Sequence, residues 1–291
     1  MGIYCPSFSK VNIGLKVLKQ RDDGYHNIYT LFQKLDFGDE LILEKMENSC
    51  LITSNVDWIP TDKSNICYKA YNVLKTLYPN LGGICIQIEK KIPIGSGLGG
   101  GSANGAAVLK GLNNLYDLGL SMLELEKIGA SVGADVPFFI RGGTQLGEGL
   151  GNKLTPFPKP ISGIYLLIIP KFFINTSWAY TELGKKLKFD TKVPNFRRFF
   201  NGDNPSYKFE FFENDFERIV IPAYPEIGTI KQKLLKLGAC FASLSGSGST
   251  VFGIFDDDTL VTKAESFFQT SYQTILANPA QFPPFESQSK N

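Results

Sequence analysis

The 291-residue sequence has a single histidine, His26, and its five cysteines never form a C-x-x-C pair. One histidine excludes a multi-histidine metal site, and the absence of a C-x-x-C pair argues against structural zinc. An odd number of scattered cysteines is typical of reduced thiols, so we expect a cytoplasmic protein.

Long apolar runs and a large charge of one sign are also absent. The longest apolar run, Ile164–Ile169, is far too short to cross a bilayer. The N-terminus has no signal-like pattern, and Pro6 disrupts a myristoylation motif. A net charge of +2 gives no reason to expect a nucleic acid or a membrane as partner. We therefore predict a soluble protein. We expect it to be a monomer or a homodimer.

The first half of the chain predicts a mixed set of strands and helices. Alternating apolar residues over 11–17 predict a strand, and Lys10 and Asn12 then share its other face. Asp23 and Gly24 form a turn signal between this strand and the next. The other elements expected here are a strand over 28–44, a helix over 64–78, a strand over 84–88, a helix after residue 103, and a helix from Ser121 to about Gly133.

The second half predicts a different layer. Strands are expected at 164–169, 240–244, 251–255 and 272–276, with helices at 226–237 and 258–268. This β-α-β-β-α-β order is that of a ferredoxin-like layer. We therefore expect an α+β fold with two domains, residues 1–155 and 156–291. Residues 185–217 are interpreted as an insertion, and the polar tail from Pro279 is expected to be frayed.

One glycine-dense stretch follows a predicted strand and leads into a predicted helix. So many glycines favour a close approach of the backbone to a ligand, and free amides at a helix N-terminus bind anions, usually phosphate. The stretch therefore predicts a nucleotide site. Its residues are Pro93, Ile94, Gly95, Ser96, Gly97, Leu98, Gly99, Gly100, Gly101, Ser102 and Ala103.

Three other interpretations of this stretch are weaker. A dinucleotide fingerprint needs an acidic residue after a second strand, and the nearest candidate, Asp117, follows a helix. A Walker A loop needs a lysine, and none lies between Lys91 and Lys110. A simple tight turn would rarely use so many glycines.

This stretch resembles the second motif of the GHMP kinases, which phosphorylate small molecules. Four other segments resemble one branch of that family: 6–12, 21–26, 133–139 and 245–248. The resemblance implies a domain like ribosomal protein S5 domain 2 followed by a ferredoxin-like one, with ATP bound as MgATP. It also implies phosphorylation of the 2-hydroxyl of a cytidine diphosphate-linked methylerythritol, in non-mevalonate isoprenoid biosynthesis. The alternatives are a mevalonate or homoserine kinase, or an inactive nucleotide-binding module.

Phosphoryl transfer to an alcohol needs a base and charge stabilisation. Asp135 lies in an apolar stretch where an unpaired carboxylate is costly to bury, and the resemblance implies that it is the base. Its alternative role is a helix N-cap. Lys10 is the expected partner, which either contacts phosphate or only orients Asp135 and the hydroxyl. The alternative for Lys10 is a solvent-facing strand lysine.

The resemblance also implies the substrate-binding residues. Tyr25 and His26 follow a turn and suit a cytosine, one by stacking and the other by hydrogen bonding. Asn12, Thr176 and Tyr180 complete the predicted set. Residues 245–249 form a second glycine-rich loop, expected to pack against the nucleotide loop and the substrate pocket, with a hairpin turn as the alternative. No magnesium ligand is assigned.

Overall fold

The computed structural model describes residues 2–157, 159–186, 196 and 209–280, and it contains two β-sheets. The first sheet has the order β3-β4-β2-β5-β6, with β1 also paired to β2. All of its pairs are antiparallel except β3 with β4. Its strands are β1 (Gly2–Gln20), β2 (His26–Met46), β3 (Cys50–Ser54), β4 (Gly83–Glu89), β5 (Thr144–Gly149) and β6 (Lys153–Pro156).

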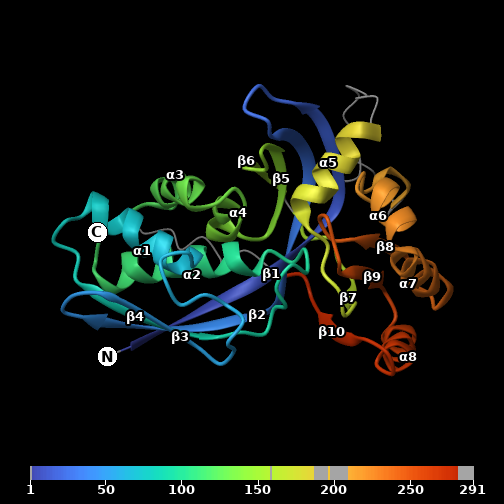
Figure 1. The fold of residues 1–291 in the computed structure, drawn as a ribbon. Helices are drawn as coiled ribbons and strands as arrows, with labels where there is room; N and C mark the ends of the chain where they lie inside the picture. Colours follow the sequence, from blue (N-terminus) through green and yellow to red (C-terminus); the bar gives the residue numbers. More distant parts are fainter. Residues whose placement is uncertain (1, 158, 187–195, 197–208, 281–291) are drawn as a thin grey trace.

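Helices α1 to α4 cover one face of the first sheet (Figure 1). Small residues let α2 pack closely on this face, where Gly111 comes against Leu43 of β2. The capping box predicted at Ser121 and Glu124 is present at the start of α3. The four helices are α1 (Ile66–Leu77), α2 (Gly100–Leu115), α3 (Met122–Val132) and α4 (Val136–Arg141).

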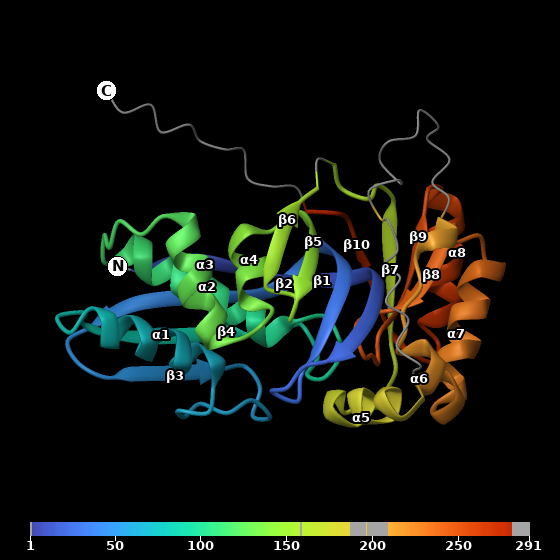
Figure 2. The ribbon, with the colours of Figure 1, turned by 90° about the horizontal axis from the view of Figure 1, so that it is seen from above.

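The second sheet has the order β10-β7-β9-β8, all antiparallel, with α7 and α8 on its outer face (Figure 2). This arrangement confirms the predicted ferredoxin-like layer. Helices α5 and α6 are additional elements between β7 and α7. The elements are β7 (Ile164–Ile169), α5 (Thr176–Lys186), α6 (Glu217–Ala223), α7 (Pro225–Lys236), β8 (Phe241–Leu244), β9 (Val251–Phe255), α8 (Asp258–Phe268) and β10 (Gln273–Ala277).

Strand β1 contributes to three hydrophobic cores, the first of them through Cys5, which packs under the helices of the first sheet. Val11 and Ile13 pack between the two sheets, whereas Leu15 and Val17 belong to the core between the second sheet and its helices. The pairing of β1 with β2 shifts by one residue between Asn12 and Gly14. The alternating residues predicted to be apolar are therefore all buried, but in two places rather than one.

The segment interpreted as an insertion, 185–217, lies largely outside the described residues. Its described end packs against β1, because the backbones of Leu15 and Asn214 form a bridge. The tail expected to be frayed begins with two ordered residues. Pro279 bridges to Leu35, and the amide of Ala280 donates to the Lys34 carbonyl. In the described ranges of the chain, no helix has the length and apolar character to span a membrane.

Candidate active site

A cavity of about 640 Å³ lies where β1, the β1–β2 turn, the start of α4, and α5 meet two glycine-rich loops. Figure 1 shows the β1–β2 hairpin and α5 next to each other. The structure therefore brings together side chains from widely separated parts of the sequence. The predicted residues that line the cavity are Lys10, Asn12, Tyr25, His26, Asp135, Thr176 and Tyr180.

Lys10 is buried at the floor of this cavity, with 5% of its surface exposed. Its Nζ donates to Asn12 Oδ1 at 2.6 Å and to the Gly97 carbonyl at 3.1 Å. The same atom lies 4.0 Å from Asp135 Oδ2. Burial lowers the pKa of Lys10, and the Asp135 carboxylate opposes that shift. The alternative of a solvent-facing strand lysine is wrong.

Asp135 occupies the N-cap position of α4, but its side chain makes no capping hydrogen bond. Pro137 in the first turn removes one backbone donor that a cap would satisfy. The side chain keeps 32% of its surface exposed and lines the cavity. Asp135 therefore stands at the N-cap position, as the alternative predicted, but its carboxylate does not cap the helix.

Asn12 connects Lys10 to the strand behind it. Its amide donates to Thr30 Oγ1 at 2.8 Å, and the Thr30 hydroxyl donates to the Gly14 carbonyl at 2.7 Å. All three polar groups are buried, so this chain of bonds fixes which side of the Asn12 amide faces Lys10. No sequence pattern marks Thr30, because a threonine inside a strand carries no distinctive signal.

The predicted nucleotide loop joins β4 to α2. Gly95, Gly97 and Gly99 have positive φ angles, which other residues rarely adopt. Gly99 is the N-cap of α2, provides no side-chain cap, and no acidic residue follows in the first turn. The first amides of this long helix therefore present an anion site. Of the loop residues, Gly97 and Gly99 line the cavity, while Ile94 is 63% exposed.

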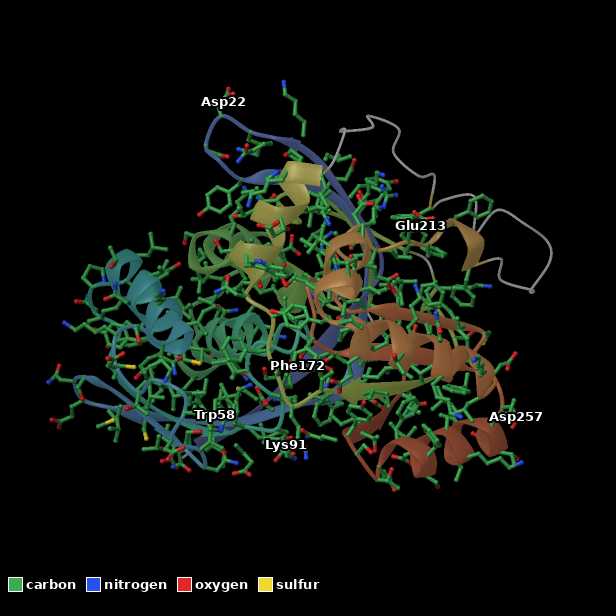
Figure 3. The ribbon with its side chains drawn as sticks, turned by 45° about the vertical axis from the view of Figure 1, so that its right-hand side comes forward. Asp22, Trp58, Lys91, Phe172, Glu213 and Asp257 are labelled. Carbon is green, nitrogen blue, oxygen red and sulfur yellow. The ribbon has the colours of Figure 1, made fainter. Side chains whose placement is uncertain are left out.

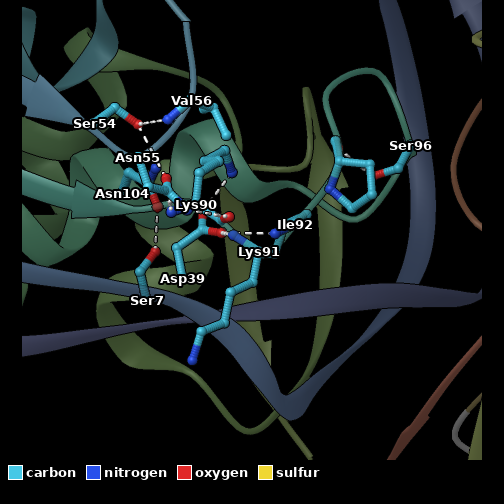
Figure 4. A network of polar contacts seen from close by, with 11 residues as sticks. Ser7, Asp39, Ser54, Asn55, Val56, Lys90, Lys91, Ile92, Ser96 and Asn104 are labelled. Atoms are coloured by element: carbon cyan, nitrogen blue, oxygen red, sulfur yellow. Dashed lines mark hydrogen bonds and ion pairs between the residues drawn. The ribbon is translucent and has the colours of Figure 1, made fainter. Parts of the chain in front are cut away.

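A buried carboxylate fixes the start of this loop (Figure 4). Asp39 Oδ1 accepts hydrogen bonds from the amides of Lys91 at 2.8 Å and Ile92 at 2.7 Å. Its other oxygen pairs with the Lys90 ammonium. Asp39 is 1% exposed, and removing either partner would leave an uncompensated charge. The loop is thus held in place before any ligand binds.

The second glycine-rich loop connects β8 to β9 and packs on the first loop. Ser245 Oγ donates to the Gly97 carbonyl at 2.9 Å, and the amide of Thr250 donates to the Ser96 carbonyl at 3.1 Å. Gly246 and Ser247 line the cavity. The hairpin alternative and the predicted packing on the nucleotide loop and the pocket are therefore both correct.

Aromatic side chains form another part of the cavity lining. The rings of His26 and Tyr180 stack at 5.5 Å with 22° between their planes, while Tyr25 is 66% exposed at the rim. Burial lowers the pKa of His26, which favours the neutral imidazole with one donor and one acceptor nitrogen. Burial, reinforced by Asp135, raises the pKa of Tyr180 to about 12. Thr176 shares a 3.0 Å hydrogen bond with Ser247.

Two family models match the chain. The GHMP kinases N terminal domain matches residues 65–143, and the GHMP kinases C terminal domain matches residues 200–274. A 4-diphosphocytidyl-2-C-methyl-D-erythritol kinase of Thermodesulfovibrio yellowstonii is 39% identical over 275 residues, which cover 92% of this chain and 94% of the relative.

Solved structures of similar fold include one kinase with the same named activity as the relative above. A crystal structure of a 4-(cytidine 5'-diphospho)-2C-methyl-D-erythritol kinase superposes with a TM-score of 0.80 at 27% identity, covering 95% of this chain and 98% of the other. A homoserine kinase from Cytophaga hutchinsonii has a TM-score of 0.73 at 19% identity, covering 97% and 95%. The second likeness shows a shared fold alone.

Proposed function

The chain belongs to the GHMP kinases, in the branch of the 4-diphosphocytidyl-2-C-methyl-D-erythritol kinases, and we propose that Lys10 and Asp135 are its catalytic pair. The chain phosphorylates the 2-hydroxyl of 4-diphosphocytidyl-2-C-methyl-D-erythritol with ATP, in non-mevalonate isoprenoid biosynthesis. The observation that carries the proposal is the 4.0 Å approach of the ammonium and the carboxylate inside one cavity, beside the nucleotide loop.

Asp135 acts as the general base. Phosphoryl transfer through a loose transition state requires that the reactants be positioned and that the acceptor hydroxyl lose its proton. A carboxylate that faces the cavity can accept that proton. Tyr180 also faces this cavity, but its pKa of about 12 keeps the phenol protonated near neutral pH. Asp135 is the only carboxylate among the described residues that line the cavity.

Lys10 supplies positive charge next to the reacting atoms. Three acceptors surround its ammonium, namely Asn12 Oδ1, the Gly97 carbonyl and Asp135 Oδ2. A charge held this firmly needs no reorganisation during the reaction, which makes it effective at stabilising a developing negative charge. Because the Gly97 carbonyl belongs to the nucleotide loop, Lys10 also ties the ATP site to the acceptor site.

The cytosine of the acceptor lies between Tyr25 and the His26–Tyr180 stack. A neutral imidazole can read the donor and acceptor groups on a pyrimidine edge, and an exposed tyrosine ring can close over its face. Asn12 and Thr176 contact the rest of the acceptor. Mevalonate and homoserine have no pyrimidine, so this aromatic wall favours a cytidylated substrate over either of them.

ATP occupies the loop formed by residues 93–103, with its phosphates at the N-terminus of α2. Among the residues that the structure describes, no three histidine, cysteine or acidic side chains form a metal cage. Mg²⁺ would then be held by the nucleotide phosphates and water, and Asp135 is the one carboxylate among the described residues of the cavity lining that could assist. When bound, Mg²⁺ neutralises charge on the transferring phosphoryl group.

The remaining features belong to the same proposal. A boundary near residue 155 separates an N-terminal ATP-binding domain from a C-terminal ferredoxin-like domain. All five cysteines are free thiols, which supports a cytoplasmic enzyme. Its partner is a small molecule rather than a nucleic acid, and the enzyme is a monomer or a homodimer.

The test is to offer ATP with the cytidylated methylerythritol, with mevalonate and with homoserine in parallel, and to follow ADP release. We expect rapid ADP release with the cytidylated acceptor alone. Preference for mevalonate or homoserine would replace the substrate assignment. If the protein binds ATP but releases no ADP with any of the three acceptors, it is an inactive nucleotide-binding module.

A further inference from the structure

Asn214 connects β1 to the second glycine-rich loop. It is 2% exposed and lies next to Glu213, which Figure 3 shows beside α6. Two backbone hydrogen bonds fasten the segment to β1, from the Leu15 amide to the Glu213 carbonyl at 2.8 Å and from the Asp215 amide to the Leu15 carbonyl at 2.9 Å. The Asn214 backbone is therefore fixed relative to the strand that carries Lys10.

The Asn214 side chain makes three hydrogen bonds. Its Nδ2 donates to the carbonyls of Leu244 and Gly246, both at 2.8 Å, and its Oδ1 accepts from the Phe216 amide at 3.0 Å. Glu217 holds the other side of Leu244, because its Oε1 accepts from the Leu244 amide at 3.0 Å. The end of β8 and the first turn of the loop are thus held by one short segment.

Gly246 is the point at which this loop comes near the hydrogen-bonded side chains of Lys10 and Asn12. A Cβ built on Gly246 would lie 3.5 Å from Asn12 Oδ1 and 3.6 Å from Lys10 Nζ. Gly246 therefore lies beside the ammonium with no side chain between them, and a displacement of its backbone would change the space next to Lys10. The neighbouring Ser245 hydroxyl donates to the Gly97 carbonyl, which also accepts from Lys10.

We propose that Asn214 is a positioning residue for phosphoryl transfer, whose amide holds Gly246 against the Lys10–Asn12 pair. This inference rests on the proposed function of Lys10. Asn214 is not among the described residues that line the cavity, so it acts through Gly246 rather than by touching the acceptor. Its loss should let the ammonium shift away from the place it holds beside Asp135.

The decisive variant is Asn214→Asp. It keeps the size of the side chain and the acceptor for the Phe216 amide, but it turns the donor into an oxygen facing two carbonyls. We expect kcat per folded molecule to fall at least tenfold, while KM for ATP and for the cytidylated acceptor changes less than threefold. Folded protein is quantified by thermal unfolding before each assay, so that a loss of stability is not counted as a loss of rate.

Asn113→Asp is the matched control. Asn113 also uses its amide to hold a loop, donating to the Leu120 carbonyl at 3.0 Å and accepting from the Leu120 amide at 2.9 Å, and it does not appear in the described cavity lining. We expect its kcat per folded molecule to match the wild type even where its unfolding temperature falls. If Asn214→Asp yields no folded protein, Asn214→Ser is judged by the same criterion.

A kcat within twofold of the wild type for the folded Asn214 variant would overturn the inference, as would an equal fall in kcat for Asn113→Asp. The wild type in the same assay tests the proposed function separately. ADP release by the wild type with the cytidylated acceptor, together with an unaffected Asn214 variant, would reject only the positioning role.

Discussion

The ammonium of Lys10 and the carboxylate of Asp135 lie 4.0 Å apart, but they differ in exposure. The Lys10 side chain is 6% exposed and faces three acceptors, whereas the Asp135 side chain is 32% exposed and lines the cavity. The Asp135 carboxylate is thus accessible to an incoming alcohol, while the Lys10 ammonium is buried next to it. A substrate can reach Asp135 without displacing Lys10.

Asp135→Asn should abolish turnover and leave ATP binding intact. The amide keeps the shape of the side chain but cannot accept the acceptor proton, so kcat should fall by about 10²–10⁴-fold. Steady-state kinetics gives kcat, and titration calorimetry gives the dissociation constant for ATP. Turnover at the wild-type rate would remove Asp135 as the base.

Tyr25→Ala should weaken binding of the cytidylated acceptor. Loss of a ring that stacks on a base costs about 1–3 kcal/mol, which appears as a higher KM for that substrate alone. Tyr4→Ala is the matched control, because Tyr4 is 61% exposed and Tyr25 66%, and Tyr4 is absent from the described lining of the cavity. An unchanged KM in Tyr25→Ala would count against the cytosine assignment.

Gly97→Ala should destabilise the protein and weaken ATP binding together. Gly97 has a φ of +78°, and a Cβ there would clash with the Ser245 carbonyl oxygen. Gly119→Ala isolates the backbone term, because Gly119 has a φ of +69° with open space around it. We expect Gly119→Ala to cost about 1–2 kcal/mol in unfolding free energy, and Gly97→Ala to cost clearly more. If urea unfolding gives the same loss of unfolding free energy for both variants, the contact between the two glycine-rich loops contributes little to stability.

Lys34→Met should stabilise the protein at pH 7. Burial, with the like charge of Lys110, lowers the pKa of Lys34 from 10.5 to about 8. The unfolded chain therefore binds more protons between pH 8 and 10.5, so wild-type stability rises with pH in that window. Below pH 8 the cost of the buried ammonium is fully present, and its removal should raise the unfolding free energy by up to about 3 kcal/mol.

Urea unfolding at pH 7 and at pH 9.5 checks this prediction. The advantage of Lys34→Met should shrink at the higher pH, because Lys34 is then mostly neutral in the folded wild type. Lys63→Met, at an exposed position before α1, controls for the general loss of a lysine. A variant that is less stable than the wild type at pH 7 would contradict the buried-charge interpretation.

The local signals of the sequence proved sufficient for most elements. The capping box at Ser121 and the glycines around Gly97 each depend on the chemistry of a few adjacent residues. The structure also brings Lys10 and Asp135 together as the hypothesis required, although 125 positions separate them. That pairing was reached through the resemblance to a family, because periodicity says nothing about which distant residues meet.

Other parts of the site have no local signal. Asn214 lies at the end of a stretch with weak periodicity, and its importance comes from two carbonyls about 30 residues later in the chain. Helix α4 spans only six residues, too few to show a helical repeat. Asp39 resembles an ordinary strand carboxylate until its backbone partners at Lys91 and Ile92 are known.

Strand β1 has a mechanical consequence beyond its catalytic lysine. Because Ile13 packs between the sheets and Val17 belongs to the core of the second one, melting of either half would expose apolar residues that the other half buries. Heating should therefore give a single calorimetric peak rather than two. If the chain is split near residue 155, the N-terminal fragment keeps β1 with its apolar residues exposed, and the C-terminal fragment lacks that strand. We therefore expect the two fragments to fold only when they are expressed together.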